Sequence, residues 1–197
     1  MIYIYKIIGL FLIPLIKLNI IFRINKGKEM QSRYKERFGK SSYLPKNKKD
    51  IIWIHAASVG EFKSADYFIK KLHNEYNILV TTTTVSAANF AKNNYGNKII
   101  HQFAPFDVSI WVKNFLNNWK PILIIWIESD LWPITLNCIR KRGITAILVN
   151  VRLSPKSFNR WKILPFFYKS LINCFAEVYA QSKIDQKRIQ SISNKKI

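Results

Sequence analysis

Short apolar runs alternate with longer amphipathic segments along most of this chain. Ile51–His55 is an apolar run, and Phe62–Tyr76 follows it with apolar residues near helical spacing. Similar strand-like runs recur at Ile78–Thr82, Ile99–Phe103, Pro121–Ile127, Ala146–Asn150 and Glu177–Gln181, and helix-compatible segments at Ser109–Trp119 and Leu131–Lys141. Runs that are apolar throughout, such as Ile122–Ile127, are typical of strands covered on both faces. The pattern predicts an α/β domain with a doubly wound, mostly parallel sheet.

The first 22 residues form a separate apolar segment. Lys6, Lys17 and Asn19 interrupt it, and its uninterrupted part is shorter than the roughly 20 apolar residues that a spanning helix needs. One continuous helix would place the two lysines on the same face, about three turns apart. We therefore expect an uncleaved membrane-anchor helix over residues 1–25 that either spans the bilayer or lies in its interface. The alternative is an amphipathic helix packed on the domain's own core.

Residues 26–50 are expected to form a basic linker or helix, and residues 51–191 the folded domain. The basic cluster at this junction consists of Arg23, Lys26, Lys28, Arg33, Lys35 and Arg37. Such a cluster keeps its flank cytoplasmic and attracts anionic headgroups. The cluster therefore predicts a location on the cytoplasmic face of a membrane.

Composition narrows the choice of partner. The chain has 32 Lys and Arg against 11 Asp and Glu, a formal charge of +21, and 49% hydrophobic residues, enough to bury a core. Membrane surfaces, phosphorylated substrates and nucleic acids all fit this charge, but no aromatic-basic nucleic-acid motif is present, so we expect no nucleic-acid partner. Cys138 and Cys174 lack the spacing of a disulfide framework or zinc site, so no metal is expected.

Polar residues collect just after the predicted strands, where open α/β sheets bind their ligands. Glu61 follows the first strand and Glu128 the fourth, so the two carboxylates could converge on one cleft. A carboxylate there can accept a proton from a hydroxyl. No GxGxxG or GxxxxGK[ST] motif is present, which excludes a dinucleotide fingerprint and a P-loop.

Each of these positions also has a purely structural interpretation. Glu61 could only complement the positive end of its helix, and Glu128–Asp130 could cap the next helix. Ser86 could cap the helix after the threonine run. The residues expected in the core are His55, His101, Trp111, Phe115 and Trp119.

Five motifs in register resemble the amino-terminal half of 3-deoxy-D-manno-octulosonic acid (Kdo) transferases. They are RYKERFG (Arg33–Gly39), WIHAASVGE (Trp53–Glu61), HQFAPFD (His101–Asp107), ESDLWP (Glu128–Pro133) and NVRLSPKS (Asn150–Ser157). The resemblance implies the amino-terminal Rossmann-like domain of a two-domain GT-B glycosyltransferase, which transfers Kdo from a CMP-Kdo donor to a bisphosphorylated lipid A precursor in lipopolysaccharide synthesis. It also implies an inverting reaction and no cofactor.

By position, the resemblance makes Glu61 the proton acceptor and Glu128 a transition-state stabiliser. The residues expected to contact substrate are Ser58, Gly60, Asp130, Asn150, Arg152 and Ser154, Arg152 as a ligand of an acceptor phosphate. The motif ESDLWPI departs from the family pattern ETELWPN at Asp130 and Ile134, which shortens one carboxylate and removes one polar group.

The chain also ends before the family's CMP-binding domain. We expect either a separately encoded CMP-binding half that docks with it, or a truncated form. The alternative function is a non-catalytic domain that binds glycolipid at the membrane surface, or an inactive fragment.

Overall fold

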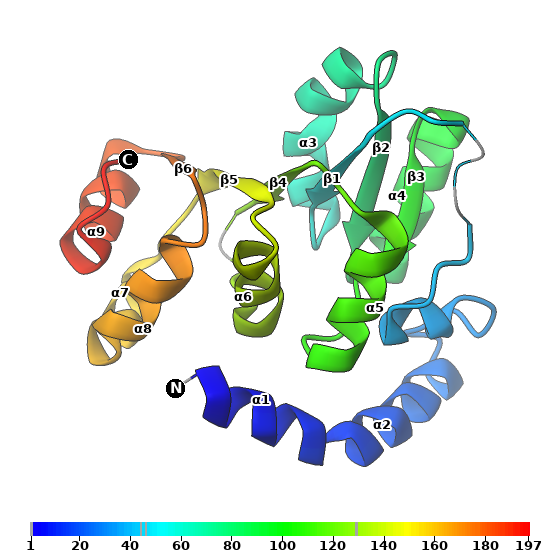
Figure 1. The fold of residues 1–197 in the computed structure, drawn as a ribbon, viewed down its shortest axis with the longest axis horizontal. Helices are drawn as coiled ribbons and strands as arrows, with labels where there is room; N and C mark the ends of the chain where they lie inside the picture. The colour runs from blue at the N-terminus through cyan, green and yellow to red at the C-terminus, as the bar shows by residue number, and fades with distance from the viewer. Residues whose placement is uncertain (1, 44, 46, 129) are drawn as a thin grey trace.

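Six parallel strands form one sheet at the centre of the molecule (Figure 1). The structure is a computed structural model that describes residues 2–43, 45, 47–128 and 130–197. The sheet order is β3-β2-β1-β4-β5-β6. The strands are β1 (Ile51–His55), β2 (Asn77–Thr82), β3 (Ile100–Phe103), β4 (Leu123–Ile127), β5 (Thr145–Val151) and β6 (Glu177–Ala180). This arrangement confirms the predicted Rossmann-like α/β fold.

The central strands are buried on both faces, as their apolar runs predicted. Ile54 of β1 pairs in register with Val80 of β2 on one side and with Ile125 of β4 on the other. All three side chains are at most 1% exposed. The predicted strand at Pro121 begins two residues later, at Leu123; proline lacks the N–H that a ladder needs.

Helices cover both faces of the sheet. On one face, α3 (Val59–Leu72) and α4 (Val85–Tyr95) pack through small and aromatic residues such as Ala65 and Phe62. The other face is covered by α5 (Ser109–Trp119), α6 (Pro133–Lys141), α8 (Pro165–Ile172) and α9 (Lys183–Ser193). Trp111, Phe115 and Trp119 are buried there, as predicted. The remaining elements are α7 (Pro155–Ile163) and the short 3-10 helix η2 (Gly96–Lys98).

Two of the structural interpretations of capping residues are wrong. Thr84, not Ser86, caps α4, because its hydroxyl accepts from Ala87 N. Glu128 and Asp130 do not cap α6, which begins only at Pro133 and has Trp132 at its N-cap position. The carboxylate of Asp107, after β3, instead accepts from Thr135 N at 2.7 Å and Ile134 N at 3.0 Å. A residue distant in sequence therefore satisfies the first amides of this helix.

The amino-terminal segment is two helices, α1 (Ile2–Phe11) and α2 (Ile13–Asn25), bent by 59° where they meet. Pro14 lies in the first turn of α2, where its missing N–H is tolerated. The expectation that one straight helix places Lys6 and Lys17 on one face is therefore wrong. Within the described residues α1 has no buried side chain and α2 has only Ile20, yet α1 contacts α5 and α6. The segment therefore packs against the domain on one side, as the alternative expected, and exposes apolar side chains on the other.

The segment expected as a basic linker packs into the domain. It contains the 3-10 helix η1 (Tyr34–Phe38), and Gly39 follows at φ 72°. A Cβ on Gly39 would lie 2.0 Å from the Trp111 carbonyl oxygen, so only glycine fits. Arg33 and Arg37 face the protein, because Arg33 pairs with Glu36 and Arg37 with Glu29. These two members of the basic cluster do not face outward.

Candidate active site

Glu61 and Glu128 lie on the two sides of the point where the strand order reverses. Glu61 follows β1 and Glu128 follows β4, and these two strands pair directly in the sheet. In doubly wound sheets this switch point, at the carboxyl ends of the strands, is where ligands bind. The structure therefore brings together the two carboxylates that the sequence singled out.

The Glu61 side chain is held by the loop that precedes α3. One carboxylate oxygen accepts from Ala57 N at 2.7 Å and the other from Ser58 Oγ at 3.1 Å. In return, Ser58 Oγ accepts from Glu61 N at 3.3 Å and so caps α3. This is a variant of the capping box, a reciprocal pair of hydrogen bonds at a helix start. Glu61 thus lies in the first turn of α3, where its negative charge complements the positive end of the helix. The same hydrogen bonds fix the orientation of its carboxylate.

The surroundings make Glu61 a stronger base than an ordinary glutamate. Burial raises its pKa, the hydrogen bonds from Ala57 and Ser58 oppose this, and the negative charges of Glu128 and Asp130 raise it further. The influence of Glu128 and Asp130 also shows that three carboxylates share one region. A higher pKa increases the tendency of the ionised carboxylate to take a proton.

The backbone at Glu128 and Asn150 is in the left-handed region, with φ of 63° and 57°. Glu128 N donates to Val149 O at 2.9 Å, so the neighbouring strand β5 fixes this turn. Asn150 Nδ2 donates to Ser64 Oγ of α3 at 3.2 Å. Left-handed residues other than glycine are uncommon and cluster at functional sites. Sequence reasoning missed this feature, although asparagine is enriched in the left-handed region and so carries a weak signal at Asn150; glutamate carries none.

An aromatic cluster lies beneath the β4 end of the site. The His55 ring is 4.2 Å from the Trp126 ring and 4.7 Å from the Trp132 ring, measured between centroids. Trp126 Nε1 donates to Asp130 O at 2.8 Å, which ties the loop to this cluster. His55 also bonds Thr81 Oγ1, and burial together with the Arg37 charge lowers its pKa to about 3. His55 is therefore a neutral core residue, as predicted, and His101 is likewise held by Arg33 and Thr82.

The remaining predicted site residues have different surroundings. Gly60 is exposed in the first turn of α3, and a Cβ there would meet only Ser58 Oγ, at 3.8 Å. Asp130 and Arg152 are exposed in the loops after β4 and β5. Ser154 caps α7 by accepting from Ser157 N. Ser129, within the ESDLWP motif, lies outside the described residues, as do Met1, Leu44 and Lys46.

Sequence reasoning also missed a buried ion pair, Glu29–Arg37, which is connected to the loop that holds Glu61. Arg37 donates to both carboxylate oxygens of Glu29, at 3.1 and 3.3 Å, and to Thr83 O at 2.6 Å. Thr83 in turn donates from its N and its Oγ1 to Ala57 O, at 3.0 and 2.9 Å. Because Ala57 N donates to Glu61, a continuous chain of hydrogen bonds runs from Glu29, just beyond α2, to the Glu61 carboxylate.

The loop after β5 has a comparable support. Asp185 of α9 accepts from Leu153 N at 2.8 Å, and Arg188 donates to Leu153 O at 2.9 Å.

Within the described ranges, no group of three or more His, Cys, Asp or Glu side chains could hold a metal ion. The groups that the described site offers to a substrate are carboxylates and backbone amides.

The family model for 3-deoxy-D-manno-octulosonic-acid transferase matches residues 32–197. That is most of the chain and includes all five motifs. The chain belongs to this family. Among the relatives, the 3-deoxy-D-manno-octulosonic acid transferase of Rickettsia bellii is 38% identical over 191 residues, which is 95% of this chain and 45% of the relative.

Two further relatives widen the comparison. A probable mitochondrial 3-deoxy-D-manno-octulosonic acid transferase of Arabidopsis thaliana is 41% identical over 75% of this chain and 34% of its own length. The Haemophilus influenzae transferase is 28% identical over 85% of this chain and 40% of its own length. The chain thus spans less than half the length of these relatives.

No single helix among the described residues is both long and apolar enough to cross a membrane. The bent pair α1–α2 meets the requirement only when its two helices are taken together, by length and composition.

Proposed function

We propose that this chain is the acceptor-binding half of an inverting glycosyltransferase that transfers Kdo from CMP-Kdo to a bisphosphorylated lipid A precursor. The observation that carries the proposal is the pair of carboxylates at the switch point, with Glu61 hydrogen-bonded in place and its pKa raised. Membership of the transferase family supports the choice of sugar and reaction.

In the proposed reaction, an acceptor sugar hydroxyl attacks the anomeric carbon of Kdo and CMP departs with the bonding electron pair. Glu61 takes the hydroxyl proton as the new bond forms, a contribution of about 10²–10⁴-fold for a positioned base. Positive charge develops at the anomeric centre, and the nearby Glu128 carboxylate stabilises it. Ser58, Gly60, Asp130, Asn150, Arg152 and Ser154 line the acceptor side, where Arg152 binds a phosphate oxygen.

Donor binding is assigned to a second domain. The relatives continue well beyond the matched region, and we propose that a CMP-binding half completes the site, as the carboxy-terminal domain of a GT-B enzyme or as a separate chain. The second candidate function is non-catalytic binding of the glycolipid at the membrane surface. The same acceptor-side residues would support this binding function if no CMP-binding half joins the chain.

The proposed location is the cytoplasmic side of the inner membrane, held by residues 2–25. The exposed apolar side chains of this segment support it: Tyr3, Ile4, Ile7, Ile8, Phe11, Leu15, Leu18, Ile21 and Phe22 are each at least half exposed. Lys26 and Lys28 follow directly, and both are exposed toward the expected anionic surface.

A chimera tests the enzymatic proposal. The matched segment of the Rickettsia bellii relative is replaced by this chain, and the purified chimera is incubated with CMP-Kdo and the tetraacylated lipid A precursor. Formation of the Kdo-lipid by mass spectrometry, absent from the same chimera carrying Glu61→Gln, supports the proposal. A folded chimera that binds both substrates but transfers nothing, beside an active parent, contradicts it and favours the binding-domain alternative.

A further inference from the structure

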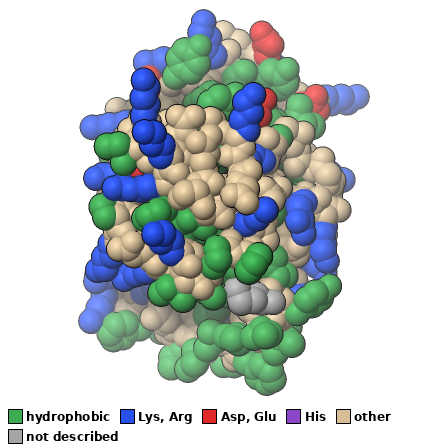
Figure 2. Space-filling view, turned by 90° about the vertical axis from the view of Figure 1, so that its left-hand side faces the viewer, with side chains coloured by type: hydrophobic (Ala, Val, Ile, Leu, Met, Phe, Trp, Pro, Cys, Tyr) green, Lys and Arg blue, Asp and Glu red, His purple; other side chains and the backbone are tan. Residues whose placement is uncertain are grey.

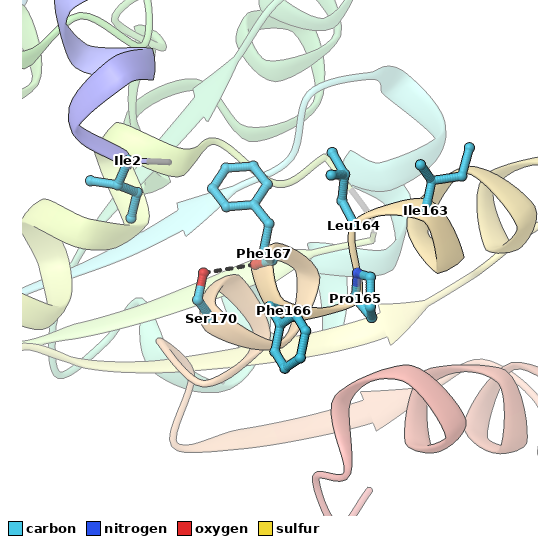
Figure 3. A pocket seen from close by; sticks show the side chains of 7 residues that line it. All are labelled: Ile2, Ile163, Leu164, Pro165, Phe166, Phe167 and Ser170. Carbon is cyan, nitrogen blue, oxygen red and sulfur yellow. Dashed lines mark hydrogen bonds between the residues drawn. The ribbon is translucent and has the colours of Figure 1, made fainter.

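An apolar groove of about 410 Å³ opens where α7 meets α8, next to the first turn of α1 (Figure 3). It is lined by Ile2 and by Ile163, Leu164, Pro165, Phe166, Phe167 and Ser170. Phe167 points toward Ile2, while Phe166 points away from it on the outer side of α8. The groove therefore joins two segments that are more than 150 residues apart in the sequence.

The rim of this groove exposes an unusual amount of apolar surface. Ile163 is 77% exposed and Phe166 is 87% exposed, although neighbouring Tyr168 and Leu171 are fully buried in the core. A contiguous exposed apolar patch marks an interaction surface, whereas single exposed apolar residues need no explanation. We call Ile163, Leu164 and Phe166 the α7–α8 corner.

The charges around the corner are of one sign. Residues 131–176 contain no Asp or Glu, and the corner is flanked on its own two helices by Lys156, Arg160, Lys162 and Lys169. Lys162 Nζ lies 4.8 Å from the centre of the Phe158 ring, so its ammonium group is held beside the apolar surface. Apolar side chains bordered by lysine and arginine suit an anionic bilayer, in which the rings enter the acyl boundary and the cations meet headgroup phosphates.

The corner is continuous with the apolar amino-terminal segment. The ends of α7 and α8 that form it lie on the same side of the molecule as α1 and α2 (Figure 1). Figure 2 shows hydrophobic side chains gathered at the lower end of the molecule, with Lys and Arg above them. Ile2 lines the groove, so the first turn of α1 borders the corner.

We propose that the α7–α8 corner inserts into an anionic bilayer as a second membrane contact, beside residues 2–25 of α1 and α2. A single amphipathic helix allows the domain to roll about the helix axis, whereas a second contact fixes that angle. The corner lies at the far end of α7, the helix that follows the loop of Arg152 and Ser154, so the two contacts set the height and tilt of the cleft over the membrane. The inference does not depend on transfer activity.

A fluorescent label at the corner tests the insertion directly. Phe166→Cys carries an environment-sensitive dye, and the native Cys138 and Cys174 are buried and have raised pKa values, so they react slowly. Tyr67→Cys on α3, 65% exposed and on the opposite end of the molecule, is the matched control. On vesicles of phosphatidylcholine with phosphatidylglycerol, we expect a blue shift and quenching by brominated lipid at position 166 and neither at position 67. Equal behaviour at the two positions would overturn the proposal.

Vesicle affinity provides an independent readout. Ile163→Ser combined with Phe166→Ser should weaken binding to the mixed vesicles by on the order of a hundredfold, since each buried apolar side chain contributes about tenfold or more. Tyr67→Ser should change the vesicle affinity less than twofold. The difference in affinity between the double variant and the parent should shrink when phosphatidylglycerol is omitted. Unchanged affinity of the double variant, or a loss of self-association in sedimentation without vesicles, would overturn the proposal; the latter would assign the corner to a second copy of the chain.

Discussion

The loops after β1 and β4 each carry one proposed catalytic carboxylate, but they hold it in different ways. After β1 the backbone turns directly into α3, and the hydrogen bonds that orient Glu61 come from the neighbouring Ala57 and Ser58. After β4 the chain takes a left-handed turn at Glu128, held by β5 through Val149 O and by Trp126 through Asp130 O. The first loop is a local helix start, whereas the second depends on its neighbours in the sheet.

This difference suits the two proposed roles. A proton acceptor must keep a fixed position relative to one hydroxyl, and a carboxylate within a capping box has little freedom. A charge that stabilises the transition state acts through the field at the site, so its backbone can be strained without loss of function. The β1 loop also has a long-range support, because Thr83 connects it to the buried Arg37.

The largest expected effect is on catalysis. In the chimera, Glu61→Gln should lower kcat by about 10²–10⁴-fold, because the amide cannot accept a proton. Glu128→Gln, which retains the shape of its side chain, should lower kcat as well; because the Glu128 charge raises the pKa of Glu61, this variant should also shift the acid limb to lower pH without removing it. Steady-state transfer assays at several pH values check both variants. A Glu61→Gln variant with parental kcat would break the proposed division of roles.

The pH dependence follows from the raised pKa of Glu61. Because the protonated carboxyl cannot act as a base, transfer should fall as pH drops through this raised pKa, so the acid limb should lie at higher pH than an ordinary glutamate would give. The folded-state pKa lies above the unfolded one, so the ionised carboxylate costs stability as pH rises through it. Glu61→Gln should therefore remove both the acid limb and this part of the pH-dependent stability. Chemical denaturation across the same pH range measures the second effect.

The next effect is on stability. Arg37→Met removes one partner of a buried ion pair and leaves Glu29 uncompensated, so we expect a loss of about 3–5 kcal/mol in the free energy of unfolding. Lys35→Met, two residues away and exposed, is the control and should change it by less than about 0.5 kcal/mol. Urea unfolding followed by circular dichroism measures both. If the two variants matched, the Glu29–Arg37 pair would not be a support of the β1 loop.

A smaller loss is expected at the cap of α3. Ser58→Ala removes the hydroxyl that accepts from Glu61 N, and losing such a cap costs about 1 kcal/mol. Ser32→Ala, at an exposed turn, should have almost no effect. Urea unfolding compares the two variants, and amide exchange at Glu61 reports the cap itself. An unprotected Glu61 amide in the parent protein would mean that the cap does not form.

The smallest effect is expected at Glu128 and has the opposite sign. Glu128→Gly relieves a left-handed backbone that glycine adopts freely, so the free energy of unfolding should rise by up to about 1 kcal/mol. Glu128→Ala keeps the strain and should differ little from the parent. The comparison is made by urea unfolding. Equal stabilities for the glycine and alanine variants would show that this turn is not strained, and the contrast between the two loops would disappear.

Much of the fold could be predicted from the sequence. The central strands are buried on both faces, so each one is a short, continuously apolar run that is easily found in the sequence. The runs at Ile51–His55 and Ser109–Trp119 became β1 and α5 with the same bounds. The positions of Glu61 and Glu128 after their strands could also be predicted, since parallel strands bring their carboxyl ends to one edge. The capping box of Ser58 and Glu61 is local as well.

Only the tertiary structure decided the rest, because it depends on contacts between residues distant in sequence. Arg37 reads as one more surface cation, yet Glu29 and three carbonyl groups bury it. Asp107 caps a helix that begins 26 residues later, and β5 holds the left-handed turn at Glu128. The bend between α1 and α2 and the meeting of Ile2 with the α7–α8 corner likewise follow from packing. The sequence by itself determined the sheet and where its carboxylates stand; long-range hydrogen bonds and packing determined how they are held.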